Sequence, residues 1–460
     1  MERRTAAATR LPWALAAAVV GLLAALAAQE GARSAAATVV AVAVLVIALV
    51  LVLPHPERGV LLMLLVLPLD VAGRLLTEPL SITVFHVSLL LTLVAWAIAW
   101  LRDPETSAPR LSALDVGIAA LVAAAVWSLP GSLDKAATVV SIVRLVFLWL
   151  FTLSVVTFVR DERMADRVVS VVVGTGAASS MLALVQYAVP GFPIGSTHVD
   201  VAAGGVSRAR PGAFFEDPNL LGTFLSVAVI AALAKAVHAR RWRDAAVWLA
   251  LAGVCGLGLG VTLSRTGMVG VLLGVVVLVM TAPRKRRPWL AGAAVACAAV
   301  ILLAAPGQVL DRLTSVVDIE ADSSIRTRYL MVGSTVDMIR DRWVFGTGLG
   351  AYSLAYPKYR RIGALISITR PHQLPLALWA EMGIMGLVSE ILIVGSIVWV
   401  VRSRRHRGWN VYESLGVAGL LAVLVQSLFQ YYLYFEYLWL FLALTVAATR
   451  FTRDAEEVHV

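Results

Sequence analysis

The chain has little charge and little cysteine. Only 15% of its 460 residues are charged, whereas about 25% is usual in a soluble domain. Its two cysteines, Cys255 and Cys297, both lie in apolar segments, where cysteine usually packs as a small core side chain. The seven histidines are scattered, and neither a CxxC nor an HExxH spacing occurs. These absences argue against an ordinary soluble domain, a disulfide-stabilised domain and a metal centre of either motif.

Apolar residues are abundant instead. Hydrophobic residues make up 60% of the chain. They form runs of roughly 18 to 25 residues, and about 20 residues cross the hydrocarbon core of a membrane. The pattern predicts an all-α polytopic membrane protein with about 14 transmembrane helices, in a range of roughly 12 to 14. The predicted spans cover 11–28, 35–53, 59–78, 80–101, 111–130, 137–159, 166–189, 219–238, 245–262, 265–282, 289–305, 375–401, 411–427 and 430–449.

The spans divide the chain into four regions with two longer connections between them. The second connection contains a stretch, 325–342, whose apolar residues recur at intervals of three and four. This spacing predicts an amphipathic helix with an apolar face that includes Tyr329. The four regions are N-terminal membrane helices at 1–189, central membrane helices at 190–305 with a connection at 190–218, a large connection at 306–374, and C-terminal membrane helices at 375–460.

Basic residues mark one side of the predicted bundle. Short basic stretches follow alternate spans, beginning near residues 102, 160, 235, 283 and 402. With fourteen alternating spans, these stretches and both termini fall on the same side, which the positive-inside rule makes cytoplasmic. The net charge of +10 reflects this orientation and suits an anionic inner leaflet, so no nucleic-acid partner is needed to explain it. Both long connections are then extracytoplasmic, at the outer face of the cytoplasmic (inner) membrane.

Arginines on the outer side are not explained by that rule. For any one of them, pairing with lipid phosphates is the simple interpretation. However, the outward segments that contain them follow one another in a particular order. They are RARPGAFFEDPNLLGTFL at 208–225, LSRTG at 263–267, SSIRTRYLMVGSTVDMIRDRWVFGTGLGAY at 323–352 and PHQLPLALWAEMGIMG at 371–386.

In this order and spacing the segments resemble the O-antigen ligase and polymerase superfamily, the Wzy-type membrane glycosyltransferases. The ligase pattern of that family is His, then Asn, Ser or Gln, nine residues, Gly, two residues, and finally Gly, Thr or Tyr. The chain fits it with His372, Gln373, Gly383 and Gly386. The resemblance covers about residues 205–390, and the helices before it match only in being hydrophobic.

The resemblance implies a metal-independent glycosyltransferase of the GT-C type that uses no cofactor. Such an enzyme takes a glycan from an undecaprenyl-diphosphate carrier and joins it to an acceptor hydroxyl at the outer face of the membrane. The family pattern assigns the diphosphate to Arg265 and, by its spacing before FGTGLG, to Arg328, with Arg326 as the rival candidate. Arginine suits this task because its planar fork of N–H groups matches phosphate oxygens.

His372 is the predicted catalytic base. Pro375 suits the first turn of a helix, so the imidazole should lie just ahead of a helix N-terminus, at the outer interface. The positive end of the helix dipole and the nearby Arg370 favour the neutral ring, which can accept a proton from the acceptor hydroxyl. Gly383 and Gly386 are expected to let this helix approach its neighbours closely.

Four further residues are candidates for substrate binding, besides Arg326. Arg210 and Asn219 either contact the substrate or bound the outer connection and cap the next helix. Gln373 belongs to the ligase pattern. Glu381 lies inside a predicted span, where an ionisable group needs a partner, so a structural bond is at least as well supported as a role in chemistry.

Two other classes of function remain open at this point. A lipid-linked glycan flippase or another polytopic transporter fits fourteen spans, although carriers usually show a repeat between halves and polar sites near the midplane. A non-enzymatic scaffold of an envelope complex leaves the outer arginines unexplained. Within the transferase class, ligase and polymerase are both compatible with the motifs, and the acceptor is a glycan, a lipid or a protein.

Overall fold

The computed structural model describes residues 45–69, 74–75, 82–189, 191–201, 207–304, 323–364, 371–403 and 409–457. The predicted span at 11–28 and most of that at 35–53 lie outside these residues, as does Arg370.

Most of the described chain is helical. Seven of these helices are long and apolar enough to cross a membrane, as expected for a polytopic all-α membrane protein. They are α4 (Val84–Arg102), α6 (Ala113–Trp127, continued by a 3-10 turn at Leu129–Gly131), α7 (Lys135–Phe158), α8 (Glu162–Ala188), α9 (Pro218–His238), α10 (Trp242–Thr262) and α16 (Leu374–Ser403). The others are α3 (Pro56–Val66), α5 (Pro104–Ser107), α11 (Arg265–Thr281), α12 (Arg287–Ala304), α14 (Ser323–Asp341), α15 (Tyr352–Tyr359), α17 (Val411–Ser427) and α18 (Glu436–Glu457).

One predicted span is shorter than expected. In place of 59–78, the helix α3 covers Pro56–Val66, and the chain turns at Leu67 and Pro68. Proline has no amide hydrogen and cannot continue the helical hydrogen-bond ladder. A helix of 11 residues rises about 16 Å, roughly half the thickness of the hydrocarbon core. By itself, α3 is therefore too short to cross a membrane.

The connection at 190–218 contains a β-hairpin, which the sequence does not predict. Strands β1 (Ser196–Val201) and β2 (Ser207–Ala213) pair antiparallel, with His198 opposite Arg210. Strand β2 packs against α8, α9 and α10. The strand residues are mixed polar and small, so they lack the apolar alternation that marks a half-buried strand. The hairpin brings Arg210 to the start of α9.

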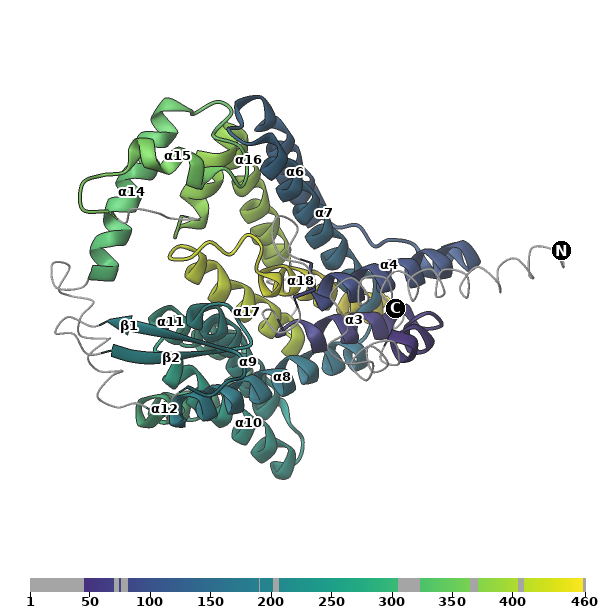
Figure 1. Ribbon diagram of the computed structural model, residues 1–460. Coiled ribbons are helices and arrows are strands. Elements are labelled where there is room, and N and C mark those ends of the chain that lie inside the picture. The colour runs from purple at the N-terminus through teal and green to yellow at the C-terminus, as the bar shows by residue number, and fades with distance from the viewer. Residues whose placement is uncertain are drawn as a thin grey trace.

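Helix α9 forms the centre of the bundle. Nearly all of it is buried, and it packs against α8, α10, α11 and α17, as the crowded lower half of Figure 1 shows. Glycines allow this close packing: a Cβ at Gly222 would lie 2.4 Å from the Cβ of Ser264, which precedes α11. Helices α6 and α16 pack together at the other side of the bundle, where most of α16 is open.

The bundle has two chemically distinct ends. At one end, called here the His372 end, α9, α11 and α16 begin and α10 and α17 finish. There His372 contacts Gln430, which follows α17. At the opposite end, α9 and α16 finish and α8 and α17 begin, and Tyr412 donates a hydrogen bond to Asp166. Arg450 of α18 bonds to the carbonyl of Arg110 before α6 at this end as well.

Helices α14 and α15 lie outside the main bundle and pack on the first half of α16 (Figure 1). The predicted amphipathic helix at 325–342 is confirmed as α14, and its buried face agrees with the prediction only in part, since Ile339 is buried. Tyr329 is 70% exposed, whereas Met331, Thr335 and Met338 are buried. The small and polar residues of this face allow contact with α15, where the Thr335 hydroxyl bonds to the hydroxyl of Tyr352 at 2.8 Å.

Candidate functional site

The first glycine of the ligase pattern breaks a helix in this structure. Helix α16 has a non-helical residue, Gly383, with φ 63° and ψ −152°. A Cβ there would lie 2.2 Å from the carbonyl oxygen of Val344, so only glycine fits. The Ile384 amide donates to the Trp343 carbonyl at 2.8 Å. The interpretation of Gly383 as a helix-packing glycine is therefore corrected: it admits the FGTGLG loop (345–350) against the backbone of α16.

Glu381 anchors the same loop. It is 2% exposed, and its Oε1 accepts hydrogen bonds from the amides of Gly350 at 3.0 Å and Tyr352 at 3.3 Å. Its Oε2 accepts a hydrogen bond from the hydroxyl of Tyr431 at 3.0 Å. The carboxylate thus joins α16, the start of α15 and the segment between α17 and α18. This geometry supports the structural alternative for Glu381 rather than contact with a substrate.

His372 lies just before α16 and beside the segment that joins α17 to α18. Its Nδ1 is 3.3 Å from Gln430 Oε1, and because that oxygen only accepts, the ring proton resides on Nδ1. The Nε2 lone pair is then the one that can take a proton. The pKa of His372 is lowered from its ordinary value, first by burial and then by the positive charge of Arg328. Gln430 was not identified from the sequence, since it stands in an aromatic stretch with no motif.

Arg328 is the arginine that the structure brings to His372. It lies in the first part of α14, half-buried, and its charge also acts on Tyr432. The side chain of Arg326 lies outside the described part of the structure. The effect on His372 supports Arg328, and the role of Arg326 stays a prediction.

A buried polar chain lies beneath His372. The pKa of Tyr432 is raised, mainly by burial, and its hydroxyl is 2.5 Å from the hydroxyl of Thr223 on α9. Thr223 also donates to Gln426 Oε1 at 2.7 Å. The negative charge of Asp217, which caps α9, acts to raise the pKa of both His372 and Tyr432. The first turn of α9 and the 428–435 segment therefore form one wall of the site.

Arg265 occupies the first turn of α11 at this same end. Its predecessor Ser264 caps the helix, with Oγ accepting from the amide of Gly267 at 3.3 Å. A Cβ at Gly267 would lie 2.8 Å from the carbonyl oxygen of Gly222 on α9. Because the first turns of α9 and α11 are pressed together, Arg265 lies at the same end of the bundle as Thr223 and Asp217.

Arg210 and Asn219 are bonded to each other. Arg210 is 9% exposed, and its Nη2 donates to Asn219 Oδ1 at 3.0 Å, while its Nε donates to the Thr262 carbonyl at 2.8 Å. This guanidinium joins β2 to the last turn of α10 and the first turn of α9. Its bonds support the loop-bounding alternative. Gln373 is half-buried, and its carbonyl accepts from the Ala377 amide at the first turn of α16.

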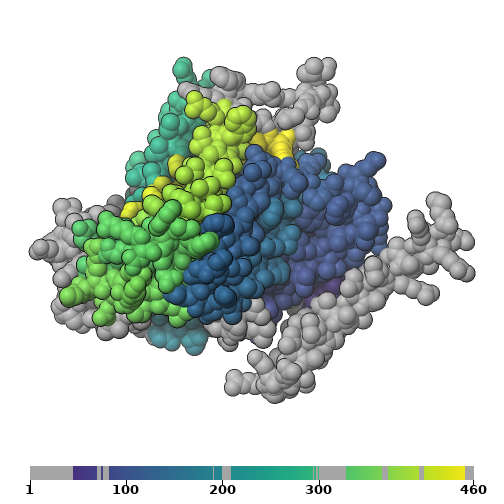
Figure 2. Space-filling view, turned by 90° about the horizontal axis from the view of Figure 1, so that it is seen from above, coloured from purple at the N-terminus to yellow at the C-terminus, as the bar shows by residue number. Residues whose placement is uncertain are grey.

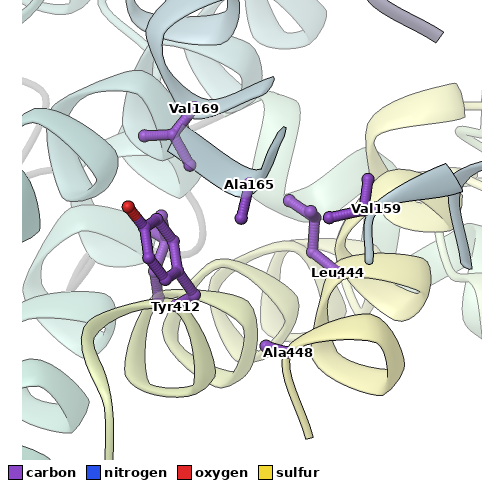
Figure 3. Close-up of a pocket in the computed structure, with 7 residues that line it drawn as sticks. Val159, Ala165, Val169, Tyr412, Leu444 and Ala448 are labelled. Atoms are coloured by element: carbon purple, nitrogen blue, oxygen red, sulfur yellow. The ribbon is translucent and has the colours of Figure 1, made fainter. Parts of the chain in front are cut away.

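A second feature of the bundle is an apolar pocket at the opposite end. It lies between α8, α17 and α18 and is lined by aliphatic side chains and the ring of Tyr412, as Figure 3 shows. The one polar lining group is the hydroxyl of Tyr412, which bonds to Asp166 at 2.9 Å. The pocket offers no group for acid–base or phosphate chemistry. The His372 end is thus the better candidate for the functional site.

Residues 250–391 match the family model described as O-Antigen ligase. No curated protein matches the chain. The matched stretch runs from within α10 into α16, so it contains Arg265, Arg328, His372 and the break at Gly383. The match confirms the resemblance drawn from the motifs: this part of the chain is similar to the O-antigen ligase family, which supports a glycosyltransferase-like membrane enzyme.

Proposed function

We propose that this protein, like the O-antigen ligase family that it resembles, transfers or polymerises a glycan from an undecaprenyl-diphosphate-linked donor onto an acceptor hydroxyl, without a metal ion. The observation that carries the proposal is the placement of His372. Its Nδ1 bonds to Gln430, its pKa is lowered, and Arg328 acts on it. Arg265 stands at the same end of the bundle, on the first turn of α11. A neutral base and two guanidinium groups are what such a transfer requires.

In the proposed reaction, His372 Nε2 accepts the proton of the acceptor hydroxyl as its oxygen attacks the anomeric carbon of the donor sugar. The bond between that carbon and the diphosphate oxygen breaks, and its electron pair leaves with the lipid diphosphate. Arg265 and Arg328 stabilise the added negative charge through charge-assisted hydrogen bonds. The lowered pKa of His372 keeps the ring neutral and ready at neutral pH.

The proposed orientation places this reaction at the outer face of the cytoplasmic membrane, with both chain termini in the cytoplasm. It is supported by exposed basic residues, which gather at the opposite end of the bundle between its helices, as in 239–243 and 283–287. A lipid carrier keeps its diphosphate at the membrane surface. The proposal of a site near that surface is supported by the apolar stretch of α16, which begins at Leu374, two residues after His372.

The direct test is transfer by the protein reconstituted in liposomes with an undecaprenyl-diphosphate-linked oligosaccharide and acceptor. Substituting His372→Ala should lower the transfer rate by about 100-fold or more, because general base catalysis contributes about that much. His238→Ala is the matched control, since that histidine lies on the last turn of α9 at the opposite end. Full activity of the His372 variant would contradict the assignment.

The same assay distinguishes a glycosyltransferase from a transporter. A flippase moves the lipid-linked glycan between leaflets and makes no new glycosidic bond. Mass spectrometry of the product therefore decides between the two classes. It also separates ligase from polymerase, since a ligase adds the glycan to a different molecule and a polymerase lengthens the glycan itself.

A further inference from the structure

A cleft that the proposed reaction does not use lies beside α14 and α15. Its volume is about 430 Å³. It opens where α14 ends and where the chain turns toward the FGTGLG loop. In Figure 2 this part of the chain is the green surface that lies against the blue surface of α6. The lining residues are Gly131, Asp341, Arg342, Trp343, Val344, Phe345, Gly346, Lys358 and Tyr359.

The lining combines one open aromatic ring, that of Trp343, with hydrogen-bonding groups. Trp343 is 57% exposed, and Tyr359 lines the same cleft. Asp341 Oδ2 accepts from the Tyr359 hydroxyl at 3.0 Å and from Lys358 Nζ at 3.3 Å. Arg342 Nη1 donates to the Gly131 carbonyl at 3.2 Å. Each of these polar groups has further donor or acceptor capacity toward the cleft.

This combination suits a carbohydrate. A pyranose ring has an apolar C–H face that packs on an aromatic ring, while its hydroxyls both donate and accept. Tryptophan and tyrosine supply a large, rigid surface of this kind. Carboxylate, guanidinium and ammonium groups at the rim bond to the hydroxyls. Lysine and arginine outnumber the one carboxylate in the lining, so neutral or acidic sugars fit better than basic ones.

The floor of the cleft is fixed by contacts from two helices. Trp127 of α6 donates its indole N–H to the Val344 carbonyl at 3.0 Å and stacks on Phe345 with a ring-centroid distance of 4.9 Å. The Trp343 carbonyl accepts from the Ile384 amide at the break in α16. A site held in this way needs little ordering when a ligand binds, which favours affinity.

The position of the cleft matches a long ligand. Trp343 contacts α16 at Ile384, whereas His372 precedes the first turn of the same helix. The helical stretch between them, from Leu374 to Met382, rises on the order of 12 Å. One sugar residue does not reach from the reacting atom to the cleft, but an oligosaccharide does. We propose that this cleft binds sugar residues of the glycan that are remote from the bond being formed, a role that rests on the proposed function.

The test measures binding rather than transfer. The probe is the free oligosaccharide released by mild acid from the lipid-linked donor that serves in the transfer assay, titrated calorimetrically into the protein in nanodiscs. Trp343→Ala should raise the dissociation constant at least tenfold, and Trp343→Phe should raise it less than threefold because an aromatic ring remains. Trp289→Ala is the matched control, since that tryptophan is 77% exposed on α12 at the opposite end, and it should bind as the unaltered protein does.

Two results would overturn the proposal: undetectable binding to the unaltered protein, or equal binding by the Trp343→Ala variant. If the Trp343→Ala protein binds the oligosaccharide unchanged but binds less phosphatidylglycerol in its nanodisc, Trp343 is a lipid anchor and the glycan proposal is wrong. Failure of the proposed function is distinguishable. His372→Ala should bind the free oligosaccharide normally while losing transfer, and retained transfer in that variant would count against the function but not against the cleft.

Discussion

The two ends of the helical bundle use arginine in different ways. At the opposite end, Arg240 and Arg241 between α9 and α10, and Arg243 in the first turn of α10, are exposed. At the His372 end, Arg210 is 9% exposed and is bonded to Asn219 and Thr262, and Arg328 is half-buried beside His372. Desolvating a cation is costly unless a partner or ligand compensates. Arg210 is compensated by its own bonds, which supports a structural role. We propose that Arg328 is held for binding, and the exposed arginines of the opposite end fit the proposed cytoplasmic orientation.

The largest expected effect follows from that difference. Arg265→Gln should lower the transfer rate by roughly 100- to 1000-fold, as the loss of a single oxyanion donor does. The matched control is Arg241→Gln at the opposite end, where the rate should change less than twofold. Both are measured as kcat with the reconstituted donor. Equal losses in the two variants would remove the functional distinction between the ends.

Helix α16 allows a comparison within one element, between the break at Gly383 and the regular half that contains Gly395. Gly383→Ala should destabilise the fold by on the order of 3 kcal/mol, since alanine is strained at φ 63° and its Cβ would meet the Val344 carbonyl. Gly395→Ala lies in the regular half of the helix, and its Cβ would meet nothing within 4 Å. That control should change the stability by less than about 1 kcal/mol, or increase it.

Thermal unfolding in detergent, followed by circular dichroism, compares the two glycine variants. A Gly383→Ala protein that unfolds at the same temperature as Gly395→Ala would show that the break in α16 is not required for the fold.

The smallest expected effect is a shift in pH dependence. Since the pKa of His372 lies below its ordinary value of about 6.5, transfer should stay constant near pH 7 and fall as the pH drops through the lowered pKa. Arg328→Gln removes a positive charge that lowers this pKa, so the acid limb should move to higher pH. Arg340→Gln, on the same helix but 76% exposed at its side chain, should leave the limb in place.

The pH profile is read from kcat/KM, which reports the free enzyme. An acid limb that does not move in the Arg328→Gln protein would show that the charge of Arg328 does not affect the pKa of His372. It would also reopen the choice between Arg328 and Arg326.

Much of the architecture could be predicted from the sequence, because helix length and apolar content are local properties. The predicted 137–159 and 219–238 appear as α7 and α9 within a few residues. The errors occur where tertiary contacts override local pattern. The buried face of α14, with Met331, Met338 and Ile339, is set by the partner helices α15 and α16, which leave Tyr329 exposed. The end of α3 at Pro68 is an exception, because proline is a local signal that the apolar run concealed. The hairpin at 196–213 has no apolar alternation to reveal it.

The sequence by itself determined the membrane-spanning class and the resemblance to the O-antigen ligase family, and it singled out His372, Arg265 and Arg328 as candidates, since these depend on residue type, order and spacing. Only the tertiary structure decided which groups face one another. Gln430 reaches His372 from 58 residues away, and Glu381 bonds to the amides of Gly350 and Tyr352. Such pairings arise from the packing of distant helix ends, which no local spacing encodes.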